Sequence, residues 1–470
     1  MPINVQHLSL DERRARGRQA AERTPVSSHR GWTPDPARPD PVTLLEEQNA
    51  TRDADLVPVR HGRMSASAFT FYRGAARIMA ADLRTTPRAG LTVQLCGDAH
   101  LSNFGGFASP ERRLLLDLND FDETLPGPFE YDVMRMAASF TIAARSNGFA
   151  KGDAKDVTLA SVAAYREAMA SFAGMRTLDI WYARLEEEDV VAGAKAIART
   201  KEDEKALKRG ERNIDKARTR DSLQALSKLA EKVDGSYRII SQPPTVVPMR
   251  ELSATYGLSG DEEETVIRKI FRAYRATLQD DRRQLLEKFE FVDAARKVVG
   301  VGSVGTRAFI VLLQGRDDQD PLFLQVKEAT TSVLEDHLPR SRFKQPGERV
   351  VQGQRMMQAA SDIFLGWSKG VDVARHYYWR QLRDMKLSPL VETMGPTALG
   401  YYAHLCGWTL ARAHARSGDP VAIDAYLGAS DEFDRAITNF ARRYADQNER
   451  DHEEFVGDIR AGRLAATVDV

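Results

Sequence analysis

Hydrophobic and polar positions follow two patterns along this chain, a helical periodicity and short apolar runs, and these predict where helices and strands lie. From residue 133, apolar side chains recur every three or four positions, which predicts a helix with one buried face. These positions are Val133, Met136, Ala137, Phe140 and Ala144. Two short apolar runs, LTVQL at 91–95 and RLLLDL at 113–118, predict strands that deliver polar residues to the loops after them.

The same patterning divides the chain into four zones and predicts an α+β fold. Residues 1–42 are rich in Arg, Pro and Asp, and the prolines of GWTPDPARPDP predict a flexible, extended N-terminal arm. Residues 43–292 predict a mostly helical lobe with polar loops near its start and a highly charged helical stretch at 184–234. Residues 293–390 predict a small β-rich lobe, and residues 391–470 predict helices that return to the large lobe.

The composition of the chain indicates which partners it is expected to lack and in which cell compartment it is expected to lie. Lys plus Arg and Asp plus Glu both number 67, so no net field favours nucleic acid or an anionic membrane. The two cysteines, Cys96 and Cys406, form no disulfide framework or metal-type spacing, and Cys96 is expected to be buried. Because the chain also lacks an apolar membrane span and an apolar N-terminal signal region, we expect a cytoplasmic protein.

A glycine-rich run lies at the start of the β-rich zone, in KVVGVGSVGTRAFIVLLQG. Its G-x-G-x-x-G spacing is shared by dinucleotide folds and by kinase loops that cover a nucleotide. A dinucleotide motif opens a helix, whereas TRAFIVLLQ is typical of a strand, so we expect the glycines in a β-hairpin. Such a hairpin is by default only a tight turn. In a nucleotide site it would cover phosphates with Gly300, Gly302, Ser303 and Gly305.

Lys327 lies near the end of the next predicted strand, FLQVKEA. By itself it would more often be a solvated strand residue, but beside a glycine hairpin it can neutralise ATP phosphates. A buried lysine needs an anionic partner, because an unpaired ammonium is costly in an apolar interior. We expect that partner to be Glu348, in the first turn of the predicted helix ERVVQGQRMMQAASD, with Glu335 as the second candidate.

Polar residues with the spacing of a phosphotransferase lie in two early segments, LCGDAHLSNFG and LDLNDFDET. Transfer of phosphate from ATP needs an aspartate that accepts the proton of the attacking hydroxyl, and an amide and a carboxylate that hold Mg²⁺. Asp98, Asn103 and Asp120 fit these three roles. Asp122 is expected to assist with metal or substrate, and His100 to have a structural role through hydrogen bonds to backbone.

At these motifs the sequence resembles a bacterial family of uncharacterised proteins, catalogued as domain of unknown function 2252. The resemblance rests on CGDAHLSNFG, LNDFDET, PFEYDVMRMAAS, FYRGAA, VKEA, VVQGQR and RRYADQNERDHEEF, and runs from about residue 43 to 460. The family is similar to protein-kinase-like folds, especially aminoglycoside and choline phosphotransferases. This likeness implies Asp98 as catalytic base, Asn103 and Asp120 as metal ligands, and Asp132 as a residue that braces the catalytic loop.

The order of the motifs departs from that of ordinary kinases, in which the glycine hairpin and the lysine come first. Here they follow the catalytic segment, which predicts a circularly permuted two-lobe kinase-like fold. Tyr401, Leu405 and Trp408 share one face of a predicted helix and are expected to pack beneath the catalytic loop. The short segment 123–131 leaves no room for a long activation loop, so a small-molecule hydroxyl or amine is the expected acceptor.

Three other functions remain open. A pseudokinase-like module would bind ATP without turnover, although it would have no need of a catalytic base. An AMP-transferring enzyme would use the same residues with ATP bound in the reverse direction. A metal-dependent hydrolase built from Asp98, His100, Asp120 and Asp122 would leave the glycine run and Lys327 unexplained.

Overall fold

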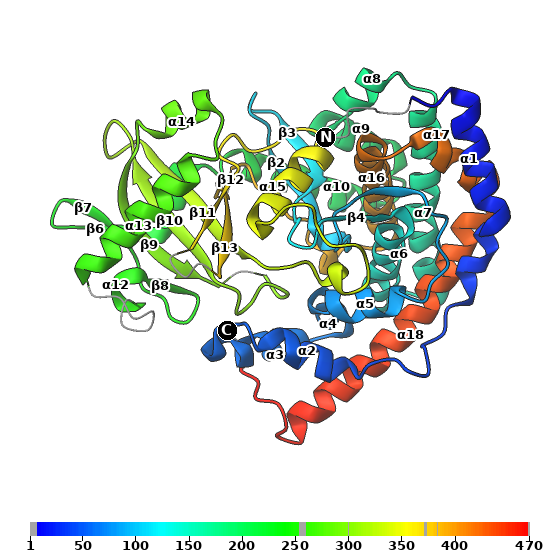
Figure 1. Ribbon diagram of the computed structural model, residues 1–470, viewed down its shortest axis with the longest axis horizontal. Helices are drawn as coiled ribbons and strands as arrows, with labels where there is room; N and C mark the ends of the chain where they lie inside the picture. The colour runs from blue at the N-terminus through cyan, green and yellow to red at the C-terminus, as the bar shows by residue number, and fades with distance from the viewer. Residues whose placement is uncertain (1–6, 253–259, 299, 371–373, 383, 469–470) are drawn as a thin grey trace.

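The fold combines a six-stranded antiparallel sheet and its covering helices with a larger group of helices (Figure 1). A computed structural model describes residues 7–252, 260–298, 300–370, 374–382 and 384–468. The predicted mixed α+β class is confirmed. The two parts lie side by side in Figure 1, with the sheet on the left and most of the helices on the right.

The larger part is built from helices of both chain ends around one hydrophobic core. α6 (Phe129–Ser146) runs through its middle, and all of its residues from 129 to 144 are buried. The periodic pattern predicted one buried face, but α4, α7, α16 and α18 contact α6 and together bury its whole circumference. The other helices here are α1 (Leu10–Arg23), α2 (Pro41–Asn49), α3 (Val57–Ser65), α4 (Ala68–Gly74), α5 (Ala76–Leu83), α7 (Lys151–Ala173), α8 (Thr177–Tyr182), α9 (Glu187–Ile197), α10 (Lys201–Arg218), α16 (Pro396–Ser417), α17 (Pro420–Leu427) and α18 (Glu432–Arg460).

The six-stranded sheet has the order β12-β13-β11-β10-β9-β8, and all its pairs are antiparallel. Helices cover both of its faces, which explains why a strand such as AFIVLLQ is almost continuously apolar. On one face, the ring of Tyr274 stacks on Trp379 at 4.4 Å. The strands are β8 (Val246–Pro248), β9 (Glu290–Lys297), β10 (Ala308–Gln314), β11 (Pro321–Ala329), β12 (Gly366–Lys369) and β13 (His376–Gln381).

Three small sheets complete the strands. β1 (Thr92–Leu95) pairs with β4 (Leu125–Pro128), and β2 (Phe104–Ala108) pairs with β3 (Leu114–Leu118), so both strands predicted from apolar runs are confirmed. β5 (Leu185–Glu186) extends the second of these sheets, and β6 (Ala230–Val233) forms a hairpin with β7 (Ser236–Ile239). The turn that follows β3 contacts the large sheet, where Asp122 meets Lys327 of β11.

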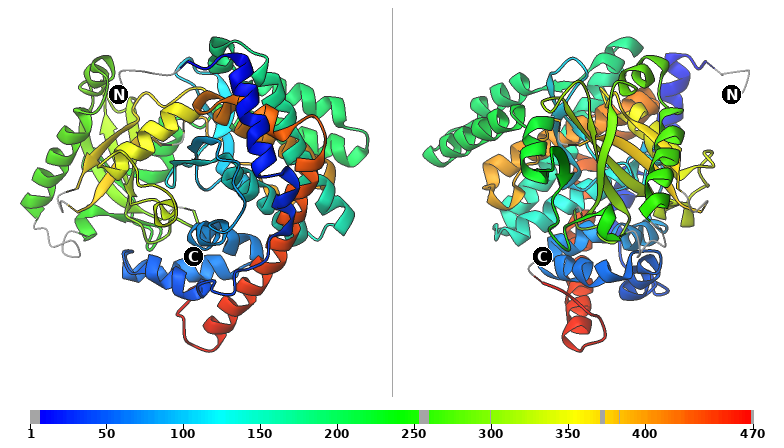
Figure 2. Two further views of the ribbon diagram at one scale, coloured as in Figure 1. Left: turned by 45° about the vertical axis from the view of Figure 1, so that its right-hand side comes forward. Right: turned by 90° about the vertical axis from the view of Figure 1, so that its left-hand side faces the viewer.

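The boundary predicted at residue 292 between the two lobes is wrong. β8 and the helix α11 (Ser222–Leu229) already belong to the sheet part, because α11 contributes Leu226 and Leu229 to the core on one sheet face. α13 (Gly260–Arg275) covers the other face, and α14 (Asp280–Leu286) follows it. These helices were expected in the helical lobe because amphipathic helices look alike whether they cover a sheet or other helices. Figure 2 shows them over the sheet.

The prediction of an extended arm over residues 1–42 is also wrong for residues 10–31. Residues 10–23 form α1, which begins at a capping box between Ser9 and Glu12 and packs on α17. The imidazole of His29 is buried against the hydroxyl of Tyr426 at 2.7 Å. The sequence of this helix has no periodic apolar stripe, because its buried residues are the small Gly17 and Ala20 and the rest is mostly charged. Gly17 packs against α17.

No helix among the described residues is both long and apolar enough to cross a bilayer.

A buried carboxyl at the start of α6 should make stability depend on pH. Glu130 is fully buried, one carboxylate oxygen accepts a hydrogen bond from Ala89 N–H at 2.6 Å, and the other has no partner among the described residues. Burial therefore raises the pKa of Glu130 to about 7.

We expect Glu130→Gln to stabilise the protein at high pH only. Since the folded pKa exceeds the unfolded one, the folded state binds the extra proton, and stability is lost as pH rises from about 4.5 to 7. The substitution removes this loss, so the free energy of unfolding should rise by roughly 2–3 kcal/mol at pH 8 and change little at pH 5. Urea unfolding at both pH values measures the difference. The exposed Glu22→Gln on α1 is the control, and an equal effect of Glu130→Gln at both values would refute the account.

Candidate active site

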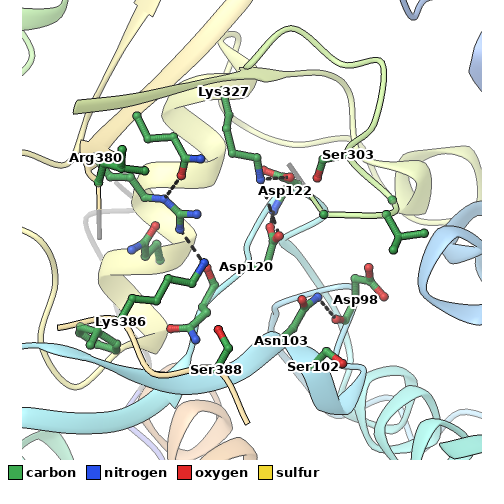
Figure 3. A pocket seen from close by; sticks show the side chains of 18 of the residues that line it. Asp98, Ser102, Asn103, Asp120, Asp122, Ser303, Lys327, Arg380, Lys386 and Ser388 are labelled. Atoms are coloured by element: carbon green, nitrogen blue, oxygen red, sulfur yellow. Dashed lines mark hydrogen bonds and ion pairs between the residues drawn. The ribbon is translucent and has the colours of Figure 1, made fainter. Parts of the chain in front are cut away.

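A cavity of about 710 Å³ lies between the six-stranded sheet and the helical part. It is lined by segments that are far apart in the sequence, and Figure 3 shows Lys327 reaching from the sheet toward Asp120 and Asp122, with Asp98 and Asn103 nearby. The predicted site residues in its wall are Asp98, His100, Asn103, Asp120, Asp122, Gly300, Gly302, Ser303 and Lys327. Among the described residues, Gly305, Asp132 and Glu348 lie outside this lining.

The loop 96–103 follows β1 and holds Asp98 in the wall of the cavity. Asp132, in the first turn of α6, accepts hydrogen bonds from the backbone N–H groups of Cys96 (2.8 Å) and Gly97 (3.0 Å). Gly97 has a φ of 84°, and a Cβ atom there would collide with the backbone of Glu123, so this position requires glycine. The structure thus places Asp132 beneath the loop as a brace for its backbone.

Helix α16 packs beneath the same loop, although not through the face that was predicted. The hydroxyl of Tyr402 lies within hydrogen-bond distance of the carbonyl oxygens of Leu101 (2.7 Å) and Phe104 (3.0 Å). Tyr401, which was expected in this place, donates to the carbonyl of Val190 instead. Neighbouring residues of a helix point about 100° apart. Because α16 has apolar residues on more than one side, periodicity did not identify the side that contacts the loop.

Asp98 is held by an arginine that sequence reasoning missed. The Nε atom of Arg135 donates to Oδ1 of Asp98 at 2.8 Å, and only 3% of the Arg135 side chain is exposed. Burial nevertheless raises the pKa of Asp98, against the opposing charge of Arg135. The carboxylate is therefore more basic than an ordinary aspartate. Arg135 follows Asp132 by one helical turn, a spacing that could have revealed it.

His100 lies against the same carboxylate. Its Nε2 atom is 3.7 Å from Oδ2 of Asp98, and its Nδ1 atom is buried without a hydrogen-bond partner among the described residues. Burial, assisted by the charges of Arg73 and Arg135, lowers the pKa of His100 well below its ordinary value. The imidazole is therefore neutral at pH 7.

Lys327 connects the sheet to the acidic turn after β3. Its Nζ atom lies 2.5 Å from Oδ2 of Asp122 and 3.6 Å from Oδ2 of Asp120, and 5.3 Å from the centre of the Tyr378 ring. Burial would raise the pKa of Asp120, but the charges of Lys327 and Arg380 outweigh it and lower this pKa to about 2. Burial and the neighbouring Asp120 raise the pKa of Asp122. Asp120 is thus the carboxylate that stays ionised under all ordinary conditions.

The predicted partners of Lys327, Glu348 and Glu335, are therefore wrong. α15 (Pro346–Met357) presents Arg349 to the acidic turn, where it donates to the carbonyl oxygens of Asp122 (2.7 Å) and Thr124 (2.6 Å). Glu348, one position earlier, lies outside the cavity lining and is half-buried. Because the acidic turn itself supplies two carboxylates, Lys327 needs no glutamate from α15.

The glycine run connects β9 to β10, which confirms the predicted hairpin. An unexpected feature is that the N-terminal segment clasps this loop. The backbone N–H of Asp53 donates to the carbonyl of Gly305 at 2.8 Å, and Arg63 donates to the carbonyl of Gly300 at 2.7 Å. Gly305 thus anchors the loop, while Gly302 and Ser303 face the cavity. No sequence pattern joins these segments, which lie more than 200 positions apart.

The acidic turn carries oxygen atoms of the kind that bind a divalent cation. Asp122 Oδ1 is buried without a hydrogen-bond partner among the described residues, and Asp120 and Asn103 line the same cavity. In the described part of the chain, no three Asp, Glu, His or Cys side chains converge closely enough to hold a metal ion by themselves. Mg²⁺ usually takes one or two carboxylates and completes its shell with phosphate oxygens and water, so Asp120, Asp122 and Asn103 are the side chains that would hold it here.

The highly charged stretch at 184–234 includes the helices α9 and α10, which line a second, mostly apolar cavity of about 230 Å³. This second cavity shares residues 388–390 with the large one.

The sequence of this chain matches the model of a protein family. A family model described as an uncharacterized protein conserved in bacteria (DUF2252) matches residues 52–458. The chain belongs to this family. All residues that line the large cavity lie within the match, apart from Gln48 and Thr51. Comparisons with curated proteins and with solved structures give no match.

Proposed function

We propose that this DUF2252 protein is an ATP- and Mg²⁺-dependent phosphotransferase that acts on a small-molecule hydroxyl or amine. One observation carries the proposal: Lys327 of the sheet lies 2.5 Å and 3.6 Å from the two carboxylates that follow β3, in a cavity that also contains Asp98, Asn103 and the glycine loop. A lysine, side chains that can bind a metal ion and a base in one cavity are the parts that phosphoryl transfer needs.

Asp98 is the proposed base. Its raised pKa and its contact with Arg135 suit a carboxylate that must accept a proton and be held in one orientation. In the proposed step, the acceptor oxygen or nitrogen forms a bond to the terminal phosphorus, and the bond from that phosphorus to the bridging oxygen of ADP breaks. The proton of the acceptor passes to Asp98, and ADP leaves with the electron pair.

Asn103, Asp120 and Asp122 would hold Mg²⁺, which neutralises the phosphate charge. The amide of Asn103 donates to the carbonyl of Asp98 at 2.8 Å, so its side-chain oxygen is free to point toward a cation. Lys327 leaves its contact with Asp122 or shares it when phosphate oxygens enter the cavity. The side chain of Lys327 is only 3% exposed, so its ammonium is already largely desolvated.

The arrangement supports a kinase-like small lobe with permuted chain order. A glycine loop joins the first two strands of three consecutive antiparallel strands, β9, β10 and β11, and the lysine is on the third. The helix α15 follows, as the helix after the lysine strand does in kinases. The absence of a glutamate from α15 beside Lys327 is a departure, which Asp122 compensates.

A small acceptor fits the short connection between the acidic turn and α6. The residues 123–131 are taken up by the strand β4 and by the start of α6, so they form no platform for a peptide. Lys386 and Ser388 also line the large cavity (Figure 3), beside the second, mostly apolar cavity.

Thermal unfolding with nucleotide tests the proposal. ATP with Mg²⁺ at about 100 times its dissociation constant should stabilise the protein by ~2.7 kcal/mol and raise Tm by several degrees. Asp120→Asn should remove the Mg²⁺-dependent part of this rise, whereas Asp156→Asn on the exposed face of α7 should leave it unchanged. If ATP with Mg²⁺ leaves the Tm of the wild type unchanged, the proposed function fails.

A further inference from the structure

Arg73 is a cation of the cavity wall that the proposed chemistry has not yet used. It belongs to the last turn of α4, is half-buried, and lines the cavity together with Asp98 and Gly302. The carbonyl oxygen of Arg73 lies 3.0 Å from where a Cβ atom on Gly302 would be, so the tip of the glycine loop rests on its backbone.

The backbone next to Arg73 is tied to the proposed base. Arg135, which donates to Asp98, also donates to the carbonyl oxygen of Tyr72 at 2.8 Å. The carbonyl oxygen of Gly74 accepts a hydrogen bond from the buried Arg60 at 3.0 Å. Both neighbours of Arg73 are therefore fixed, and the residue stands between the glycine loop and Asp98.

Other cations of the wall have partners within the protein. Lys327 pairs with Asp122, Arg112 pairs with Asp384 at 2.6 Å, and Arg380 donates to Gln325 at 3.0 Å. Arg52 donates to the carbonyl of Val304. Within the described part of the chain, the guanidinium of Arg73 makes neither a hydrogen bond nor an ion pair, and its Cζ atom lies 6.0 Å from the centre of the Phe69 ring.

A half-buried guanidinium without a partner is a binding group for an oxyanion. Arginine stays protonated in proteins, and its planar donors match the oxygens of phosphate. Partial removal from water makes each such hydrogen bond stronger than on an open surface. The carboxylates of Asp98 and Glu392 act on Arg73 only through their fields, so its donors remain available.

We propose that Arg73 binds the terminal phosphoryl group of the bound triphosphate. This inference rests on the proposed function and adds one residue to it. The glycine loop covers phosphates on one side, and Asp98 receives the acceptor's proton on the other, so a donor between them meets the group that is transferred. Arg73 thus takes the place of an arginine that stabilises transferred charge, supplied here by the N-terminal segment.

Comparing ATP with ADP isolates this contact, because only ATP carries the terminal group. Isothermal titration of the full chain with each nucleotide and Mg²⁺ gives their affinity ratio. We expect Arg73→Met to weaken ATP binding about 10- to 100-fold and to leave ADP binding nearly unchanged. Arg73→Lys should recover part of the loss. Arg77→Met is the matched control, since Arg77 on α5 is paired with Glu47 (3.1 Å) and Asp336 (3.4 Å) outside the cavity.

Each outcome has a separate meaning. If Arg73→Met binds ATP as the wild type does, or loses ATP and ADP equally, the assignment of Arg73 is overturned while the proposed function stands. If Arg73 binds an anionic acceptor instead, ATP affinity will also be unchanged, and the assignment fails in the same way. If the wild type binds neither nucleotide, the proposed function and the assignment fail together.

Discussion

Asp98→Asn should lower phosphate transfer about 10²- to 10⁴-fold and leave binding of ATP with Mg²⁺ within a few-fold of the wild type. The reason is that Asp98 is proposed to accept the acceptor's proton, a contribution of this size for a positioned base. Asparagine keeps an oxygen for Arg135, so the loop should stay in place. Turnover, nucleotide affinity and Tm of the purified variant measure the three effects separately.

Asp120→Asn is the informative comparison for this variant, because it should show the reverse pattern. Its carboxylate is the one kept ionised by Lys327 and Arg380, so its loss should weaken the Mg²⁺-dependent binding itself. A variant Asp98→Asn that keeps full transfer activity would exclude Asp98 as the base. If transfer is absent even from the wild type while ATP binds, the protein is a nucleotide-binding module instead.

Lys327→Met is the second change with a large expected effect, on both stability and binding. Removing the ammonium leaves two neighbouring carboxylates without a counter-charge. Breaking a fully buried pair costs about 3–5 kcal/mol. Because the side chains of Asp120 and Asp122 are 30% and 28% exposed, water relieves part of this cost, and we expect about 1–3 kcal/mol. Transfer should fall 100-fold or more, since a preorganised charge on the phosphates is lost.

A double variant separates these two consequences. Lys327→Met with Asp122→Asn removes the repulsion along with the lysine, so chemical denaturation should show most of the lost stability restored while transfer stays low. The exposed Lys344→Met is the matched control and should change neither property. Normal transfer by Lys327→Met would show that the lysine only balances Asp122 and does not contact phosphate.

Local patterns in the sequence predicted several elements correctly, because each pattern depends only on neighbouring residues. The strands β1 and β3, the helix α6 and the glycine hairpin follow from apolar runs, periodicity and β-branched residues within short windows. The cavity then brings Asp98, Asn103, Asp120 and Lys327 together, which spacing alone could only suggest.

The errors concern contacts that depend on where whole elements pack. Lys327 was assigned to a glutamate of α15, but the rotation of that helix presents Arg349 instead. On α16, too, the predicted contact is wrong by one residue: Tyr402, and not Tyr401, contacts the loop that holds Asp98. Neither rotation is encoded in a short window, because both helices are apolar on more than one side.

The arginines around the site were the least predictable part. Arg73 and Arg135 reach the site from helices in the large part, and among 67 basic residues only the one-turn spacing from Asp132 distinguishes Arg135, while nothing distinguishes Arg73. A buried arginine is recognised only by the carboxylate or carbonyl oxygens that the fold brings to it. The contact between the N-terminal segment and the glycine loop was equally hard to predict, because Asp53 bonds to Gly305 through backbone atoms alone.

Mass spectrometry of a metabolite extract incubated with ATP, Mg²⁺ and the purified protein tests the central claim most directly. The account predicts that one or more small molecules gain the mass of a single phosphoryl group with the wild type, and that Asp98→Asn and Lys327→Met lose this gain. AMP added to a protein, phosphate released without transfer, or an extract left unchanged by the ATP-binding wild type would contradict it.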